Sequence, residues 1–332
     1  MKKRTMGLNG PELAPLGLGC WAMIKGVYGN ADENEAIATI HRALDEGFAM
    51  LDTADVYDNG RNEELVGKAI KGRRNQVFIN TKVGALLNTP VFFSKLNGSP
   101  EYIKSACDES LKRLGVDTID LYTLHRADPK VPIEETVGGM SELVKAGKVR
   151  YLALSEVSGD QLRRAHEVHG LTALQSEYSL FTRDPESGAL DVTRELGIAF
   201  VAFAPLGRGQ LTGRVKSTAD LDNVDRRSVF PRFSEENIRR NAVLVEALES
   251  VAADKGCTTA QLALAWLLHQ GEDIFPIPGA EKREYLDQNM AACDIALSDE
   301  ELQQIDAAVP RGAAAGGRMP ASEPTLAASS DD

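Results

Sequence analysis

The sequence has few cysteines and no long run of apolar residues. No CxxC pair occurs, and the four cysteines are scattered along the chain at Cys20, Cys107, Cys257 and Cys293. We therefore expect reduced thiols rather than disulfides. No segment approaches the roughly 20 apolar residues of a membrane-spanning helix. The basic start resembles that of a signal peptide, but Asn9, Pro11 and Glu12 interrupt it before an apolar stretch can follow. These absences predict a cytoplasmic protein that does not enter a membrane.

Basic residues are also in short supply. The chain has 37 Lys and Arg against 49 Asp and Glu, which gives a formal net charge of -12. Such a chain has no electrostatic reason to bind nucleic acid or an anionic membrane. An anionic ligand would need a local binding site. Hydrophobic residues make up 43% of the 332 residues, which is enough for a sizeable core.

Short apolar runs alternate with amphipathic stretches in a regular order. The runs are rich in Val, Ile, Leu, Ala and Phe, as is typical of strands buried on both faces. Eight strands are expected, at 16–20, 49–54, 77–83, 120–125, 151–156, 173–178, 199–204 and 274–278. Helices are expected at 33–46, 62–71, 100–114, 133–146, 160–168, 192–196, 236–255 and 259–269. Eight strand–helix units predict a single-domain (β/α)8 barrel, a fold that uses about 250 residues or more.

The two ends of the chain fall outside this alternation. Residues 3–13 could form a small hairpin that plugs the floor of the barrel. The barrel domain is expected over residues 1–310. Residues 311–332 are rich in Ala, Gly, Ser and Pro and are expected to form an irregular tail of low complexity. A long polar loop is expected at about 212–232, after the seventh strand.

Polar side chains follow five consecutive predicted strands. In a barrel of this kind, functional side chains lie at the C-terminal ends of the strands. Each of these residues alone has an ordinary structural interpretation, such as a loop cap or a buried histidine. The barrel brings them to one rim, where a buried group of opposite charges would be costly without a function. The residues are Asp52, Tyr57, Lys82, His125, Ser155, Glu156 and Gln175.

Three motifs resemble those of the aldo-keto reductases. The segment 51–57 reads LDTADVY, 80–82 reads NTK and 124–125 reads LH. The resemblance covers nearly the whole chain and places the family's catalytic tetrad on Asp52, Tyr57, Lys82 and His125. It implies a reductase that converts aldehydes or ketones to alcohols with NADPH. The 84–97 loop and the turn 126–128 most resemble the branch that includes pyridoxal reductases and plant auxin-responsive relatives.

The tetrad matches the chemistry of carbonyl reduction. Hydride addition to carbon builds negative charge on oxygen, and a proton donor must neutralise it. A free tyrosine has a pKa of about 10 and is a weak acid at neutral pH. A Lys82 cation would lower the pKa of Tyr57, and Asp52 would keep Lys82 charged. His125 would hydrogen-bond the carbonyl oxygen.

A glycine motif near the N-terminus needs a separate interpretation. Residues 17–22 match the dinucleotide pattern G-x-G-x-x-A, but no helix is predicted to open at Gly19. A Rossmann site is therefore rejected. The family resemblance instead places Trp21 in the substrate pocket, together with Tyr57 and His125.

The resemblance also implies where the cofactor lies. Ser155 and Gln175 would hydrogen-bond the nicotinamide carboxamide, and Phe203 would stack on its ring. Glu156 stands where many relatives have Asn, so its part in this contact is a departure from the family pattern. The pyrophosphate loop corresponds to Pro205, Leu206, Gly207, Arg208, Gly209 and Leu211. The adenosine phosphate would be held by Gly279, Lys282, Arg283, Gln288 and Asn289.

Cofactor choice and activity class each keep an alternative. Lys282 and Arg283 could bind the 2′-phosphate of NADPH, whereas Glu281 could accept the ribose 2′-OH and favour NADH. We expect NADPH. The alternative to an active enzyme is a slow-turnover, redox-sensing NADP-binding protein on the same fold, like the family's channel-associated β subunits. No metal is expected, because His166 and His169 lack a third ligand nearby. The expected partner is a small-molecule carbonyl, and the sequence predicts no oligomeric state.

Overall fold

The computed structural model describes residues 2–89 and 93–320. Its main sheet has eight strands, each paired in parallel with its neighbour along the chain. Each lies within one of the eight predicted runs or extends it by a residue or two, so the predicted (β/α)8 barrel is confirmed. The strands are β3 (Leu18–Gly19), β4 (Met50–Asp52), β5 (Phe78–Val83), β6 (Ile119–Leu124), β7 (Val149–Ser155), β8 (Ala173–Glu177), β9 (Ala199–Phe203) and β10 (Ile274–Pro276).

The first and last strands of the barrel meet at a glycine seam. The Gly17 N–H donates to the Pro276 carbonyl at 2.9 Å, and the Gly19 N–H donates to the Pro278 carbonyl at 3.0 Å. Gly19 and Gly279 form an isolated parallel bridge. A Cβ at Gly19 would lie only 2.8 Å from the Ile277 carbonyl oxygen. The close approach of the two strands therefore requires glycine at this position.

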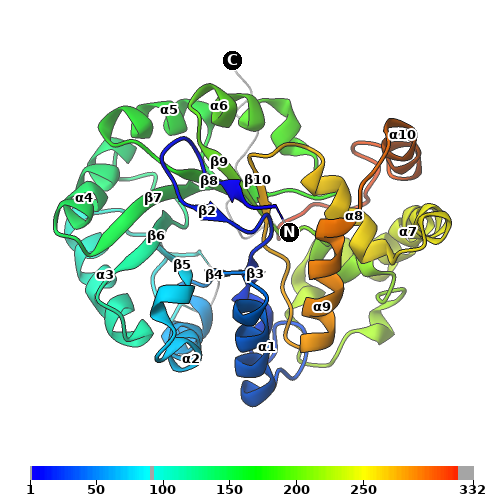
Figure 1. Ribbon diagram of the computed structural model, residues 1–332, viewed down its shortest axis with the longest axis horizontal. Helices are drawn as coiled ribbons and strands as arrows, with labels where there is room; N and C mark the ends of the chain where they lie inside the picture. Colours follow the sequence, from blue (N-terminus) through cyan, green and yellow to red (C-terminus); the bar gives the residue numbers. More distant parts are fainter. Residues whose placement is uncertain (1, 90–92, 321–332) are drawn as a thin grey trace.

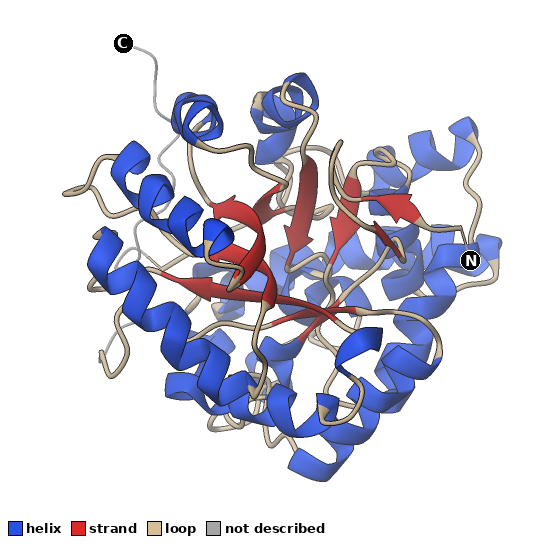
Figure 2. Ribbon diagram, turned by 60° about the vertical axis from the view of Figure 1, so that its left-hand side comes forward, coloured by secondary structure: helices blue, strands red, loops and turns tan. Residues whose placement is uncertain are grey.

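Helices cover the outside of the sheet (Figures 1 and 2). All eight predicted helices are present. Pro100 at the first position and Ser99, which accepts from the Tyr102 N–H, begin one of them as expected. The helices are α1 (Glu33–Asp45), α2 (Arg61–Ile70), α3 (Pro100–Leu114), α4 (Ile133–Lys145), α5 (Gly159–Val168), α6 (Ala189–Glu195), α7 (Glu235–Lys255) and α8 (Thr259–Leu268). Two more, α9 (Arg283–Ala291) and α10 (Asp299–Ala308), were not predicted.

The N-terminal hairpin closes the floor of the barrel. Strands β1 (Arg4–Thr5) and β2 (Glu12–Leu13) pair antiparallel. Between them Met6 is fully buried in a cluster with Phe78, Leu121 and Phe275. Figure 1 shows the hairpin, in dark blue, crossing the middle of the barrel. The predicted plug is confirmed.

The described part of the tail, residues 311–320, contains no helix or strand but packs against the barrel. The buried Asn241 side chain bonds both the N–H and the carbonyl of Ala315, at 2.7 and 3.1 Å. Arg232 donates to the Gly316 carbonyl at 3.2 Å. Residues 311–320 are irregular as expected, and the rest of the predicted tail, 321–332, lies outside the described residues. Residues 90–92 of the 84–97 loop also lie outside them.

Two smaller expectations are met. The loop at 212–232 contains only short 3-10 turns, at Thr218–Asp220, Arg226–Val229 and Pro231–Phe233. All four cysteines are free thiols. Among residues 2–89 and 93–320, no helix combines the length and apolar character needed to cross a bilayer.

Candidate active site

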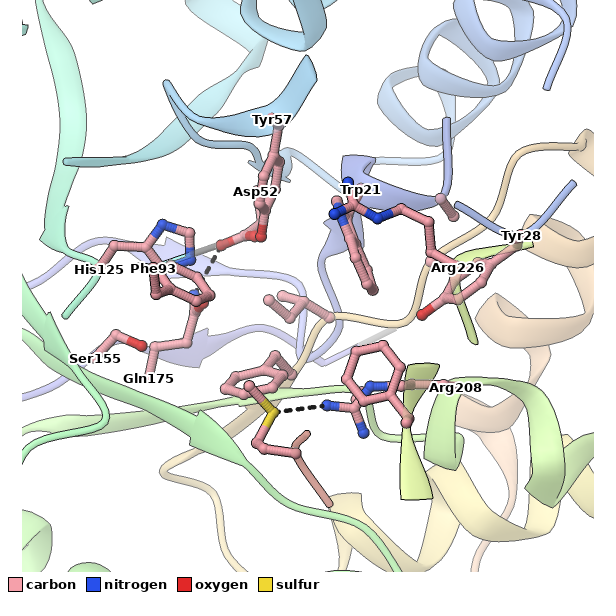
Figure 3. Close-up of a pocket in the computed structure, with 18 of the residues that line it drawn as sticks. Trp21, Tyr28, Asp52, Tyr57, Phe93, His125, Ser155, Gln175, Arg208 and Arg226 are labelled. Atoms are coloured by element: carbon pink, nitrogen blue, oxygen red, sulfur yellow. Dashed lines mark hydrogen bonds between the residues drawn. The ribbon is translucent and has the colours of Figure 1, made fainter. Parts of the chain in front are cut away.

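A cavity opens at the C-terminal ends of the strands (Figure 3). Nine of the sequence-predicted site residues line it, and Lys82 lies directly beneath it. Those that line it are Trp21, Asp52, Tyr57, His125, Ser155, Gln175, Phe203, Arg208 and Gly279. Residues that were not predicted also contribute, namely Tyr28, Phe93, Arg126, Arg226, Phe230 and Met319.

Lys82 lies beneath the cavity with its side chain fully buried. Its Nζ donates to Asp52 Oδ1 at 2.5 Å, to the Thr53 carbonyl at 2.8 Å and to the Tyr57 hydroxyl at 3.4 Å. An ammonium group has three donors, and all three have an acceptor here. The lysine is thereby aimed at the tyrosine from below.

Tyr57 reaches the cavity from the turn that follows β4. The strand ends at Asp52, and a 3-10 turn begins at Tyr57. Asp58 and Asn59 next to it have positive φ angles of 49° and 53°. Asp and Asn tolerate this left-handed backbone better than most residues. The phenol ring packs edge-on against His125, with 5.8 Å between ring centroids.

Burial and charge together set the proton states of Tyr57 and Lys82. Burial raises the pKa of Tyr57, and the Lys82 cation lowers it by a smaller amount, so the net direction is upward. We expected Lys82 to bring this pKa down. That expectation is wrong in net direction, because desolvation of the tyrosinate outweighs the lysine. Burial disfavours the Lys82 cation, but the charges of Asp52 and Tyr57 outweigh it and raise the lysine pKa. The pair is therefore a protonated phenol beside an ammonium.

His125 is neutral in this setting. Burial and the neighbouring cations Lys82 and Arg126 hold its pKa well below the ordinary value. Its ring also packs edge-on against Phe93 at 4.7 Å. Within the described residues, His125 Nδ1 and Trp21 Nε1 are buried polar atoms that lack a hydrogen-bond partner. Buried polar groups left in this way are uncommon, and both residues line the cavity, where a polar ligand could supply the partner.

Asp52 joins the tetrad to neighbouring amides. Its second oxygen, Oδ2, accepts from Asn80 Nδ2 at 2.7 Å and from Gln175 Nε2 at 2.8 Å. Thr123 donates to Asn80 Oδ1 at 2.7 Å and fixes that amide. Sequence reasoning missed Asn80. The signal was present, because Asn80 lies two residues before Lys82 and alternate strand residues point to the same side.

The predicted carboxamide contacts divide into two groups. Ser155, Gln175 and Phe203 line the cavity together. Glu156 instead turns away into the protein, where its carboxylate accepts from Ser176 Oγ at 2.6 Å and from Arg318. The structure therefore places Glu156 beside the cavity but directs its charge elsewhere.

The predicted pyrophosphate loop follows β9. It passes through Pro205 and Leu206 and then forms a 3-10 turn at Gly207–Thr212. Arg208 has a positive φ of 54° and lies in the cavity wall. Its guanidinium donates to both oxygens of Glu177, at 3.2 and 2.7 Å. We expected this charge to be available to a pyrophosphate. In the structure it is paired with a buried carboxylate. Gly209 is partly exposed, and Leu211 is fully buried in the core.

The predicted adenosine segment begins at Gly279 and continues into α9, of which Lys282 is the N-cap residue. Lys282 is exposed, with its Nζ 5.6 Å from the Tyr285 ring, and Arg214 stacks on the same ring at 4.3 Å. Arg283 pairs with Glu35 at 2.9 Å. Gln288 donates to Glu284 within the helix, and Asn289 is buried. Arg214 is a further basic residue at this place that the sequence did not reveal, because it comes from a distant loop.

Comparison of the sequence with known proteins identifies the family of this chain. The sequence model of the aldo/keto reductase family matches residues 15–310. The chain belongs to that family. It is 45% identical over 317 residues to the probable aldo-keto reductase 1 of Glycine max, covering 94% of this chain and 90% of the relative. Membership in the aldo/keto reductases implies an oxidoreductase.

Solved structures of other aldo/keto reductases share the fold. The glycerol dehydrogenase of Gluconobacter oxydans matches with a TM-score of 0.83 and 30% identity, over 93% of this chain and 95% of that one. An aldo/keto reductase of Klebsiella pneumoniae, solved in complex with NADP and acetate, matches with a TM-score of 0.74 and 29% identity, over 96% and 99% of the two chains.

Proposed function

We propose that this aldo/keto reductase uses NADPH to reduce aldehyde or ketone carbonyls to alcohols, with Tyr57 as the proton donor. The observation that carries the proposal is the buried Asp52–Lys82–Tyr57 chain of hydrogen bonds, which ends at the cavity beside His125. The cofactor supplies the hydride. The chain's own residues bind and orient the carbonyl and deliver the proton.

Each tetrad residue has a distinct part in this proposal. Tyr57 holds a proton at neutral pH and can give it to the carbonyl oxygen as negative charge develops there. Lys82 stabilises the tyrosinate that is left, and Asp52 keeps Lys82 charged and aimed. His125 is neutral and can donate one hydrogen bond that positions the oxygen. The low polarity of the buried site strengthens each of these interactions.

The residues around the cavity suit a nicotinamide cofactor. Ser155 and Gln175 offer polar groups to a carboxamide, and Phe203 is partly exposed and can stack on a planar ring. The N-terminus of α9 follows Lys282, so helix dipole and basic side chains both favour a phosphate there. The complex of the Klebsiella pneumoniae relative with NADP supports this assignment.

Three further points belong to the same proposal. We assign the protein to the branch with pyridoxal reductases and auxin-responsive relatives, on the 84–97 loop and the turn at Arg126. We place the domain at 1–310, followed by a tail at 311–332. We propose a cytoplasmic location, supported by four cysteines that are all free thiols.

The decisive test is consumption of NADPH with a generic aromatic aldehyde such as 4-nitrobenzaldehyde, followed at 340 nm. Steady turnover by the parent protein, with formation of the alcohol, supports the enzyme. Tight NADPH binding with hardly more than a single turnover would favour the redox-sensing alternative. If the parent neither binds NADPH nor reduces the aldehyde, both are wrong.

A further inference from the structure

An ion pair connects the C-terminal segment to the turn beside the proposed carboxamide site. Arg318 donates to both oxygens of Glu156, at 3.0 and 2.5 Å, across 162 residues of sequence. Both side chains are largely buried, with 12% and 2% of their surface exposed. The next residue, Met319, lines the cavity and its sulfur accepts from Arg208 at 3.5 Å, as the dashed line in Figure 3 shows.

Contacts at Ala315 and Gly316 fix the position of the segment that carries Arg318. Asn241 bonds Ala315 through both of its backbone polar groups. At Gly316, φ is 86° and a Cβ would lie 2.9 Å from the backbone nitrogen of Arg232. The chain thus passes Arg232 too closely for any side chain. These contacts place Met319 in the cavity wall and Arg318 against Glu156.

Glu156 is the point at which the ion pair acts on the site. It directly follows Ser155 and has a positive φ of 56°, which is strained for a residue with a side chain. Burial raises its pKa, but the hydrogen bonds and charge of Arg318, together with Arg126, hold that pKa at about 2. The carboxylate is therefore charged, and Arg318, Ser176 and the Glu177 N–H fix it in place.

Arg318 also lies near Glu177, the carboxylate that pairs with Arg208, and partly balances its negative charge. Glu177 is fully buried and has Arg208 at 2.7 Å, Arg232 at 3.4 Å and Arg318 at 3.9 Å. Because two other cations remain near Glu177, Arg208 could turn towards an anion in the cavity without stranding a buried negative charge. Loss of Arg318 would remove one of those two.

We propose that Arg318 is a positioning residue for the cofactor. Through Glu156 it sets the turn that carries Ser155, and it brings Met319 into the cavity wall, so that residues 311–320 retain bound NADPH. The inference rests on the proposed function. It makes the described end of the tail a working part of the site rather than an appendage of the barrel.

The test compares Arg318→Ala, Glu156→Gln and the double variant in the full-length protein. NADPH dissociation constants come from nucleotide fluorescence, and dissociation rates from stopped-flow displacement with excess NADP. Each single change should raise the dissociation rate about tenfold, and the double variant should be no worse than Arg318→Ala alone, because Glu156 acts through its pairing with Arg318. Arg318→Lys should recover part of the loss. Arg311→Ala alters the same segment at an exposed contact with Ser187 and should leave the rate unchanged.

The outcomes separate this inference from the proposed function. If the parent binds and uses NADPH but Arg318→Ala releases it at the parental rate, the inference is wrong and the proposed function stands. Additive losses in the double variant would also overturn it. If the parent does not bind NADPH, the proposed function fails first. Should Arg318→Ala unfold, Arg318→Lys and Met319→Ala give the same readout, and parental rates in both would overturn the inference.

Discussion

Gln175 donates a hydrogen bond to Asp52, with 2.8 Å between Nε2 and Oδ2, while the other oxygen of Asp52 accepts from Lys82. One carboxylate therefore orients both the lysine beneath Tyr57 and the amide expected to hold the nicotinamide carboxamide. A change at Asp52 should alter proton delivery and cofactor position together.

This link leads to an ordered prediction for two tetrad variants. Lys82→Met should lower kcat at least about 100-fold, because it removes the cation that stabilises the tyrosinate. Asp52→Asn should be less damaging to kcat, since it acts through Lys82, but it should also weaken NADPH binding several-fold through Gln175. Steady-state kinetics and NADPH titration give both numbers. A larger loss of kcat in Asp52→Asn, with thermal unfolding unchanged, would reverse the assigned roles.

Tyr57→Phe should abolish reduction while leaving cofactor affinity nearly intact. The phenol supplies the proton, and a loss of at least about 100-fold in kcat is expected when a positioned acid is removed. Tyr28→Phe is a matched control, because Tyr28 lines the same cavity, where its ring packs edge-on against Trp21 at 5.4 Å. It should keep most of the activity. More than about a tenth of parental turnover in Tyr57→Phe would be incompatible with the proton-donor role.

The pH profile of reduction follows from two shifted groups. Burial raises the pKa of Tyr57 despite the Lys82 cation, and burial with the neighbouring cations lowers that of His125. The donor proton is present below the tyrosine pKa and lost above it, so kcat should stay level from about pH 6 to about pH 9 and fall only above about pH 10. His125→Gln should lower the rate without changing this shape. A break near the ordinary histidine pKa in the parent would show that His125 titrates and is not held neutral.

Cofactor preference tests the start of α9. NADPH should bind more tightly than NADH, and a charge-assisted hydrogen bond to the 2′-phosphate should account for roughly tenfold or more. Arg283 forms an ion pair with Glu35, so Lys282→Ala should reduce the preference for NADPH more than Arg283→Ala does. Glu35→Gln should increase the preference, because it releases Arg283. The measurement is the dissociation constant of NADPH and of NADH for the parent and for each variant. Equal affinity in the parent, or an unchanged ratio in the Lys282→Ala/Arg283→Ala double variant, would show that this segment does not read the phosphate.

The barrel, and the gathering of Asp52, Tyr57, Lys82 and His125 at one place, could be predicted because their signals are local. Strands buried on both faces are short apolar runs, and the polar residues at their ends stand out against them. Helix α10 was missed although Ser298 and Glu301 form a capping box that the sequence displays. Its single buried residue, Ile305, gives almost no apolar periodicity. Helix α9 is similarly polar, with Leu286 and Asn289 as its buried residues.

Other features could not be predicted because they depend on pairs far apart in the chain. Glu156 looks in sequence like a departure from a family pattern, and only its partner Arg318 shows where its charge is directed. Arg208 looks like a free cation, and only the fold shows Glu177 beside it. The net rise in the pKa of Tyr57 also depends on how deeply the ring is buried, which no motif records.

The glycine seam has a consequence for how the site comes into being during synthesis. All four tetrad residues lie before residue 126, yet Gly19 in the cavity wall pairs with Gly279 near the other end of the chain. These four residues are therefore synthesised long before the strand that closes the barrel beside them. A chain that ended before β10 would contain all four residues but would lack Ile277 and Gly279 of the cavity wall. Because Met319 also lines the cavity, its wall is complete only once nearly all of the described chain has been synthesised.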